Sequence, residues 1–394
     1  MTQSPEQAVL DAHYMARALE LARRGHYTTR HMARALELAA RGLYTTTPNP
    51  RVGCVIVRDG QIVGEGWHVR TGEPHAEVHA LRAAGDKARG ATAYVTLEPC
   101  SHHGHTPPCA DALVNAGLAR VVAAMQDPNP EVAGRGLQRL AQAGIATESG
   151  VLEGEARKLN EGFLKRMEHG LPFVRVKLAM SLDGRTAMES GESQWITGTA
   201  ARSAVQRLRA QASVVLTGAD TVLADNARLT VRADELGLDP EQTALAMSRP
   251  PLRVLIDGRL RVPLDAPFFK AGPALVATCM AIEEQYANGP ECLIVTGADG
   301  LVDLRKLLVE LAHRGVNEVL VEAGPRLAGA FARQGLVDEF QIFIAGKFLG
   351  SSARPLLDWP LAQMKDAPEL KITEIRAVGE DWRVIAIPVP AASV

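Results

Sequence analysis

Short apolar runs alternate with amphipathic segments along most of the chain. The stretch "VGCVIVRDGQIVGEGW" (residues 52–67) holds two apolar runs joined by Asp59-Gly60, a pair typical of a tight hairpin turn. Further on, apolar runs alternate with helical patterns such as "HAEVHALRAAG" (75–85) and "GRGLQRLAQAG" (134–144). Strands that alternate with helices predict an α/β layer.

A second α/β series starts after "RMEHGLPF" (166–173). Its strongest strand patterns are "FVRVKLAMS" (173–181), "SVVLTG" (213–218) and "NEVLVEAG" (317–324). The helical pattern "PRLAGAFARQG" (325–335) follows the last of these. We therefore predict two α/β domains, residues 1–170 and 171–394.

The N-terminal region contains a tandem duplication. "MARALELARRGHYTT" (15–29) returns as "MARALELAARGLYTT" (32–46). Each copy has apolar residues at i, i+3, i+4 and i+7, the pattern of an amphipathic helix, and each runs into a glycine (Gly25, Gly42) that could form a left-handed cap. Only the second copy leads directly into the segment 48–50, so we expect it to dock and the first to be a poorly anchored extra helix.

Composition narrows the class of protein. Apolar residues make up 46% of the 394 residues, enough for a large core. The 43 Lys and Arg balance the 45 Asp and Glu, and aromatics are 4%, which argues against a protein that coats nucleic acid or stacks on bases. Five cysteines without regular spacing disfavour a disulfide framework and favour the cytoplasm. No apolar run approaches the roughly 20 residues that a membrane span needs.

Two motifs carry metal chemistry. "PHAEVHA" places His75 and Glu77 at the start of a predicted helix, and "LEPCSHHGHTPPC" (97–109) holds Cys100 and Cys109. Zinc deaminases bind Zn²⁺ through one His and two Cys, with a nearby Glu that moves protons, in the signature H-x-E…P-C-x-x-C. The first half of the signature fits, whereas eight residues separate the two cysteines here in place of two.

The residue types explain the reaction. Three protein ligands leave the fourth position of Zn²⁺ open, so the ion can activate a water for attack on an amidine carbon of a pyrimidine. Glu77 would move the proton from that water to the ring nitrogen and the leaving ammonia.

Other interpretations remain open at this point. A structural zinc site would need a fourth ligand, which His102, His103 or His105 could supply, although we expect these to line the substrate entrance. The chain could instead bind no metal, deaminate bases in nucleic acid, or be a zinc-stapled binding protein without activity. His79 could support His75 from one helical turn away, or simply pack.

The motifs together resemble one family. "TPNPRVGCVIV", "GEPHAEVHAL", "AYVTLEPCSHHGHTPPC" and "MQDPNPEVAGRG" are similar to the bifunctional riboflavin-biosynthesis deaminase/reductases, in which the stretched Pro-Cys loop is the family's own form. "KLAMSLDGRTAMESGESQWITG", "TVLADNARLTVR" and "VEAGPRLAGA" agree in the second half. The resemblance covers nearly the whole chain except the extra helix copy.

The resemblance implies a cytidine-deaminase-like three-layer α/β/α domain followed by a dihydrofolate-reductase-like α/β domain. The first would deaminate a diaminopyrimidinone that carries ribosylamine 5-phosphate. The second would use NADPH to reduce the ribosyl group to ribityl. The zinc ligands would be His75, Cys100 and Cys109, and Glu77 would be the proton donor. A homodimer, with no nucleic-acid or membrane partner, is the assembly expected of the family.

The resemblance also assigns residues in the second half. The implied cofactor positions are Ala179, Trp195, Thr221, Asp225, Gly258, Gly324, Pro325, Arg326, Leu327, Ala328, Gly329 and Ala330. The implied substrate positions are Ser193, Arg209, Leu229, Arg232 and Glu322.

Reading the residues themselves supports these assignments in part. Pro325 suits the first turn of a helix, whose free N–H groups favour a phosphate, but the same pattern fits an ordinary strand-to-helix connection. Arg209 and Arg232 could hold a phosphate through bidentate hydrogen bonds, or be solvated surface arginines. Lys177 and Asp183 could lie near the sugar or face solvent. Asn49 could hydrogen-bond a base edge, or serve only as a turn residue.

Overall fold

The computed structural model describes residues 25–101, 107–282, 286 and 289–390. The chain divides into two compact units, Met1–Glu168 and His169–Val394. The two units are described separately below.

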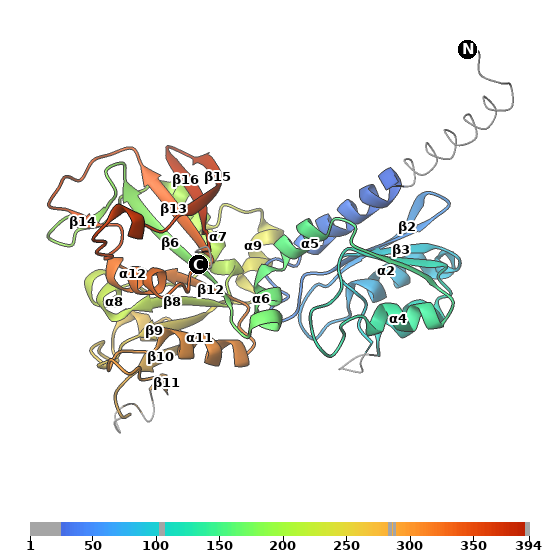
Figure 1. Cartoon of the computed structure of the whole chain (residues 1–394), viewed down its shortest axis with the longest axis horizontal. Coiled ribbons are helices and arrows are strands. Elements are labelled where there is room, and N and C mark those ends of the chain that lie inside the picture. The colour runs from blue at the N-terminus through green and yellow to red at the C-terminus, as the bar shows by residue number, and fades with distance from the viewer. Residues whose placement is uncertain (1–24, 102–106, 283–285, 287–288, 391–394) are drawn as a thin grey trace, which may run out of the picture. The chain divides into compact units, whose positions relative to one another are not determined.

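The first unit is built on a five-stranded sheet with the strand order β2-β1-β3-β4-β5 (Figure 1). Strand β1 pairs antiparallel with both β2 and β3, and β3, β4 and β5 are parallel. The predicted hairpin joins β1 to β2 through Asp59 and Gly60, which both have positive φ angles (51° and 76°). The strands are β1 (Gly53–Arg58), β2 (Gln61–Trp67), β3 (Thr92–Val95), β4 (Arg120–Ala123) and β5 (Ala146–Ser149).

Helices cover both faces of this sheet. One apolar cluster joins alternate strand residues such as Ile56 and Val121 to α2, α3 and α4, and another joins Val55 and Val122 to the helix of residues 25–40, α5 and α6. The helices are α2 (Ala76–Ala84), α3 (Cys109–Asn115), α4 (Arg135–Gln142), α5 (Glu153–Leu159) and α6 (Glu161–His169). The unit is therefore a three-layer α/β/α domain, as predicted.

The second copy of the duplicated helix packs on the sheet. Met32, Ala35 and Leu38 are at most 2% exposed and belong to the core cluster. The backbone of Ala35 approaches β1 so closely that a Cβ on Gly53 would lie 2.0 Å from the Ala35 carbonyl oxygen. The first copy lies outside the described residues up to residue 24. Neither predicted glycine cap forms, because Gly25 lies within the helix of residues 25–40 and Gly42 lacks a positive φ angle.

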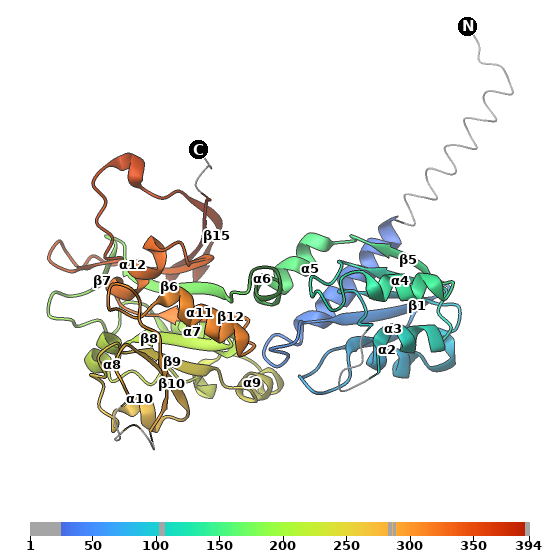
Figure 2. The ribbon, with the colours of Figure 1, turned by 60° about the horizontal axis from the view of Figure 1, so that its bottom comes forward.

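The second unit contains a nine-stranded sheet with the order β11-β10-β9-β8-β12-β6-β13-β16-β15, whose strands are labelled in Figure 1 and seen from another side in Figure 2. The strands from β11 to β13 are parallel, and β16 and β15 continue the sheet as an antiparallel hairpin. Its strands are β6 (Phe173–Ser181), β8 (Val214–Gly218), β9 (Leu252–Ile256), β10 (Ala274–Thr278), β11 (Glu291–Ile294), β12 (Glu318–Glu322), β13 (Glu339–Ala345), β15 (Leu370–Val378) and β16 (Asp381–Pro388). A separate two-stranded ribbon pairs β7 (Arg185–Ala187) with β14 (Arg354–Pro355).

Helices again lie on both faces. Leu307 and Phe331, from α11 and α12, pack on the face that holds Val176 and Leu216. Ala204 and Phe268, from α7 and α10, pack with α8 on the opposite face. The helices are α7 (Thr199–Gln211), α8 (Ala219–Asp225), α9 (Pro240–Met247), α10 (Pro267–Lys270), α11 (Leu304–His313) and α12 (Pro325–Arg333). Among the described residues, no helix combines the length and the apolar character that crossing a bilayer requires.

Replacing Met32 by Ala should lower the free energy of unfolding by about 2–5 kcal/mol, because the residue is fully buried. The duplication offers a matched control in Met15→Ala, which removes the same side chain from the first copy. Thermal and chemical unfolding of the full chain would measure both. An equal loss of stability in Met15→Ala would contradict docking by the second copy.

Candidate metal centre and cofactor edge

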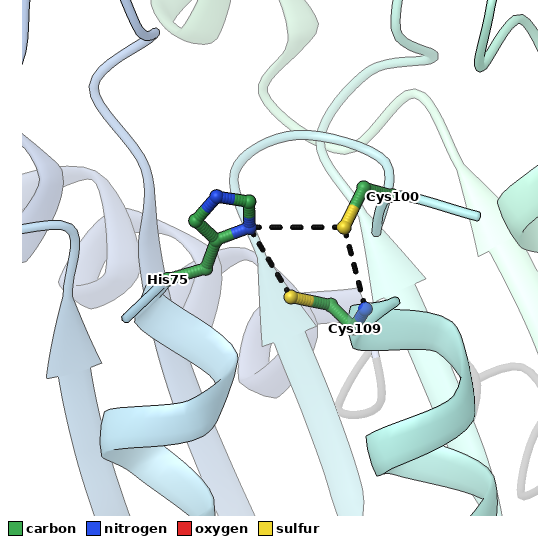
Figure 3. Close-up of side chains that lie close together, drawn as sticks. All are labelled: His75, Cys100 and Cys109. Atoms are coloured by element: carbon green, nitrogen blue, oxygen red, sulfur yellow. Dashed lines mark hydrogen bonds between the residues drawn. The ribbon is translucent and has the colours of Figure 1, made fainter. Parts of the chain in front are cut away.

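Three potential metal ligands converge in the first unit. The Nδ1 atom of His75 lies 3.7 Å from the Sγ of Cys100 and 3.3 Å from the Sγ of Cys109 (Figure 3). The three ligand atoms all lie within 4.8 Å of one another. In a tetrahedral site with Zn–S about 2.3 Å and Zn–N about 2.0 Å, sulfur and nitrogen ligands are about 3.6 Å apart, so these distances fit Zn²⁺.

The sheet explains why these residues meet. Strands β2 and β3 are both antiparallel to β1, so their carboxyl ends lie at the same edge. His75 follows β2 as the N-cap residue of α2, Cys100 follows β3, and Cys109 is the first residue of α3. Helix α2 lies against β2 so closely that a Cβ on Gly66 would be 2.4 Å from the Ala76 carbonyl oxygen, which fixes the start of the helix.

A hydrogen bond joins the two cysteines. The backbone N–H of Cys109 donates to the Sγ of Cys100 over 3.3 Å. Hydrogen bonds from Cys109, together with His75, lower the pKa of Cys100 to about 4, whereas the same shared proton and burial raise the pKa of Cys109. A bound Zn²⁺ would take both sulfur atoms as thiolates, so metal binding releases the proton that the pair shares.

Glu77 lies in the first turn of α2, two residues after His75. Its side chain is 3% exposed, and its Oε2 atom has no hydrogen-bond partner among the described residues. Burial raises the pKa of Glu77 to about 7. A buried carboxylate oxygen without a partner is costly, so its place beside three metal ligands indicates a group that binds a water or substrate atom at this centre.

Two further residues support the ring of His75. His68 lies edge-on to His75 with the ring centroids 5.3 Å apart. The Nδ1 of His68 lies 3.2 Å from the Pro74 carbonyl oxygen and its Nε2 lies 3.2 Å from the Nδ2 of Asn49. Burial lowers the pKa of His68, so the neutral ring can donate to Pro74 and accept from Asn49. Asn49 is thus held by a side chain of the centre, which a simple turn residue would not require.

The cysteine loop is held in place by Glu98, a residue that the sequence analysis missed. Its two carboxylate oxygens accept four backbone N–H groups, those of Asp127, Gly134, Gly136 and Leu137, over 2.8–3.2 Å. Glu98 is 3% exposed. An acid next to a Pro-Cys pair in an apolar strand was a visible signal, but its partners lie about 30 to 40 residues downstream.

The remaining histidines of the motif give mixed outcomes. His79 Nε2 is buried without a hydrogen-bond partner among the described residues, so its role as a support of His75 stays a prediction. His102, His103 and His105 lie outside the described residues, and the predicted entrance is not tested. Within residues 25–101, 107–282, 286 and 289–390, the group that could hold a metal contains three ligands and no fourth.

In the second unit, the implied cofactor positions gather at one edge of the sheet. Strands β9, β8, β12 and β6 are parallel neighbours. Gly258 follows β9, Thr221 and Asp225 lie on α8 after β8, and the run from Gly324 to Ala330 follows β12. Ala179 lies near the carboxyl end of β6. Parallel α/β sheets bind dinucleotides at this edge.

The start of α12 is open to an anion. Gly324 is its N-cap residue and Pro325 its first residue, as predicted, and no side chain caps the free N–H groups there. A Cβ on Gly324 would meet nothing within 4 Å, so space exists above the helix start. These observations fit a dinucleotide cofactor.

The implied substrate residues Arg209 and Glu322 bind each other. Arg209 donates from Nε and Nη2 to the two carboxylate oxygens of Glu322 over 2.5 and 2.9 Å, and from Nη1 to the Thr230 carbonyl oxygen over 3.0 Å. Arg209 is therefore not a solvated surface arginine, and its part in holding a phosphate stays a prediction. Burial favours the neutral acid, but Arg209, with Lys177 and Arg232, outweighs it and lowers the pKa of Glu322.

The other implied substrate and cofactor residues have separate contacts. Leu229 is buried with a positive φ angle of 54°, and the Nη1 atom of Arg232 lies 2.7 Å from an oxygen of Glu235. Ser193 lies 3.5 Å from Asp225 through their side-chain oxygens. Trp195 is 59% exposed.

Lys177 and Asp183, each with two possible roles from the sequence, have different surroundings. Lys177 lies within the field of Glu322 and Arg209, and burial lowers its pKa. Asp183 instead accepts backbone N–H groups from Leu349 and Gly350, over 3.1 and 2.8 Å. It therefore ties two loops together.

The first unit has the fold and the three-ligand centre of the zinc-dependent cytidine deaminases. The second unit has the fold of a dinucleotide-dependent reductase. Residues 25–125 match the family "Cytidine and deoxycytidylate deaminase zinc-binding region", and residues 172–384 match the family "RibD C-terminal domain". The chain is 55% identical over 378 residues to the riboflavin biosynthesis protein RibD of Escherichia coli, covering 94% of this chain and 97% of that protein. It is 49% identical over 387 residues to RibD of Haemophilus influenzae, covering 96% and 97%.

Solved structures of RibD proteins are also similar to this chain. Acinetobacter baumannii RibD matches with a TM-score of 0.86 and 47% identity, covering 93% of this chain and 99% of that one. A deaminase/reductase from Thermotoga maritima matches with a TM-score of 0.81 and 35% identity, covering 93% and 100%. The chain belongs to the RibD family of riboflavin-biosynthesis deaminase/reductases, which use Zn²⁺ and NADPH. This confirms the resemblance drawn from the motifs, including the fold class.

Replacing Glu98 by Gln should destabilise the first unit by roughly 2–3 kcal/mol, because an amide NH₂ would face N–H donors that now reach a carboxylate. Glu37→Gln, which removes an exposed partner of Arg34, should cost no more than about 0.5 kcal/mol. Thermal unfolding measures both. Equal stability of the two variants would show that Glu98 does not hold the loop.

Proposed function

We propose that the chain catalyses two steps of riboflavin biosynthesis. The first is the hydrolytic deamination of 2,5-diamino-6-(5-phosphoribosylamino)pyrimidin-4(3H)-one. The second is the NADPH-dependent reduction of the ribosyl side chain, which gives 5-amino-6-(5-phosphoribitylamino)uracil. We assign the first to residues 1–170 and the second to residues 171–394. The Thermotoga maritima relative is a diaminohydroxyphosphoribosylaminopyrimidine deaminase and 5-amino-6-(5-phosphoribosylamino)uracil reductase, which supports these substrates.

The convergence of His75, Cys100 and Cys109 beside the buried Glu77 carries the proposal for the deaminase. When bound there, Zn²⁺ supplies a Lewis acid that lowers the pKa of a coordinated water towards ~7. Glu77 would accept one proton of the attacking water at its unpartnered Oε2 and pass it to the ring nitrogen. It would then carry the second proton, from the new hydroxyl, to the amino group, which leaves as ammonia. Glu98 holds the cysteine loop, and His68 holds Asn49 beside the centre.

For the reductase, the carboxyl edge of β9, β8, β12 and β6 supports cofactor binding by the residues that the family resemblance implied. NADPH supplies the hydride for the first carbon of the sugar. We propose that Arg209 acts through Glu322, which it orients, and that Leu229, Arg232 and Ser193 complete the substrate site.

A purified preparation incubated with the diamino substrate tests both steps by mass spectrometry. Replacement of NH₂ by OH raises the mass by about 1 Da, and reduction adds about 2 Da more. We expect the first gain without NADPH and both gains with it. An unchanged substrate mass in the presence of zinc would refute the deaminase assignment.

Glu77→Gln should keep zinc, because Glu77 is not one of the three ligands, and should lower the deamination rate about 10²- to 10⁴-fold. The exposed Glu73→Gln, four residues earlier, is the matched control and should behave as the unmodified chain. Metal analysis and deamination assays measure the two properties. Loss of zinc in Glu77→Gln, or full activity, would favour a structural zinc site over the enzyme.

We also propose a cytoplasmic homodimer. None of the five cysteines forms a disulfide, which suits a reducing compartment. On the edge hairpin of the second unit, Ile372, Ile375 and Trp382 are 53–58% exposed, and the strand pairing puts them on one face. Exposed apolar faces of this kind mark protein interfaces. Sedimentation of the purified chain as a monomer at micromolar concentration would refute the dimer.

A further inference from the structure

Three charged side chains from three different strand ends meet at the carboxyl edge of the second unit. Asp220 follows β8, Arg261 follows β9, and Arg326 lies in the first turn of α12 after β12. The Nη2 atom of Arg261 lies 2.7 Å from Oδ1 of Asp220, and the Nη1 atom of Arg326 lies 3.8 Å from Oδ2 of the same carboxylate. Two guanidinium groups therefore share one carboxylate.

We propose that Arg261 and Arg326 bind the 2′-phosphate of NADPH, that Asp220 occupies their guanidinium groups in the free enzyme, and that this exchange gives the reductase its preference for NADPH over NADH. The family resemblance covers Arg326 as a general cofactor position but assigns nothing to Arg261 or Asp220. The inference rests on the proposed reductase function.

The position of these two arginines along the sheet edge indicates that they bind the 2′-phosphate rather than another part of the cofactor. The buried group of Lys177, Arg209 and Glu322 lies on β6, α7 and β12 and marks the reaction end, where the nicotinamide must lie. The free N–H groups at the start of α12 suit the pyrophosphate. A dinucleotide laid across the neighbouring strands β6, β12, β8 and β9 then places its adenosine at the ends of β8 and β9, beside Asp220 and Arg261.

The loop that carries Arg261 is held in a specific conformation. Asp257, 2% exposed, accepts the Val262 N–H at Oδ2 over 2.7 Å, and its carbonyl oxygen accepts the Leu260 N–H over 3.2 Å. Leu260 takes a positive φ angle of 52°, which is strained for a leucine. Val262 is 1% exposed and anchors the far side. A strained loop fixed on both sides of an exposed arginine is consistent with positioning that arginine for a ligand.

The charges of these side chains favour replacement of Asp220 by the 2′-phosphate at the two arginines. Asp220, Arg261 and Arg326 are 61%, 49% and 83% exposed at their side chains, so their mutual ion pairs add little to stability and break at small cost. One carboxylate neutralises only one of the two guanidinium groups. A 2′-phosphate near its dianionic form matches both, and arginine forks bind phosphate through paired hydrogen bonds. NADH carries only a hydroxyl at this position, so the second guanidinium group does not strengthen its binding.

Direct binding tests the proposal without turnover. Isothermal titration of the full zinc-loaded chain with NADPH and with NADH should give Arg261→Ala a Kd for NADPH about 10- to 100-fold higher, with the Kd for NADH unchanged within about twofold. Arg326→Ala should act in the same direction. Arg314→Ala is the matched control, because Arg314 also contacts two carboxylates, Glu291 and Glu310, but precedes β12 at the opposite edge of the sheet.

Asp220→Asn should change the Kd for NADPH in the opposite direction. It removes the competing carboxylate and should lower the Kd for NADPH several-fold relative to that for NADH. The same variants should change the Kd for adenosine 2′,5′-bisphosphate but not that for adenosine 5′-phosphate, because only the first carries the 2′-phosphate. Both nucleotides lack the nicotinamide. If the unmodified chain binds NADPH but Arg261→Ala changes NADPH and NADH equally or not at all, the inference fails alone. If the unmodified chain binds neither dinucleotide, the reductase assignment fails with it.

Discussion

Both sites depend on the same constraint, the shared direction of neighbouring strands. In the first unit, β2 and β3 both run antiparallel to β1, so the connections that follow them leave the sheet at one edge. That edge brings His75 and Glu77, at the start of α2, to Cys100 and Cys109, which follow β3. In the second unit, four parallel strands do the same for the cofactor positions. The sheet thus gathers residues that are far apart in the sequence, and the helices that begin there hold them in place.

Three buried acids show how the surroundings divide the roles of one side-chain type. Glu98 has both oxygens filled by backbone N–H groups and serves structure. Glu322 is held as an anion by Arg209, which keeps a charge at the reductase site. Glu77 has an oxygen with no partner among the described residues and a raised pKa. A buried carboxyl with one unpartnered oxygen beside a metal centre is the arrangement that proton transfer needs, because binding of the reactants supplies the missing partner.

The sequence predicted the layers, the hairpin, most central strands and the grouping of the metal ligands, because these depend on local patterns and on motif spacing. It could not predict which residues pair across long separations. Arg209 and Glu322 are 113 residues apart, and no local pattern announces their ion pair. The four N–H partners of Glu98 and the link between Asp220 and Arg261 are of the same kind. The antiparallel hairpin β15–β16 also escaped the pattern analysis, since β15 is largely exposed and lacks a simple alternation.

The duplicated helix shows why local sequence is not sufficient. The segment "YTT" is helical at residues 27–29 but forms a turn at residues 44–46. In the second position, Thr45 donates its hydroxyl to the Val69 carbonyl oxygen and Thr46 donates to that of Gly42, and both threonines are buried. In the first position, Thr28 is buried but Thr29 is exposed and donates to Gly25 within its own helix. The contact with the segment after β2 therefore selects the turn, and that turn leads directly to Asn49 beside His68. Helix docking and the metal centre are thus coupled through a few residues of connection, which favours the copy that joins them without an intervening segment.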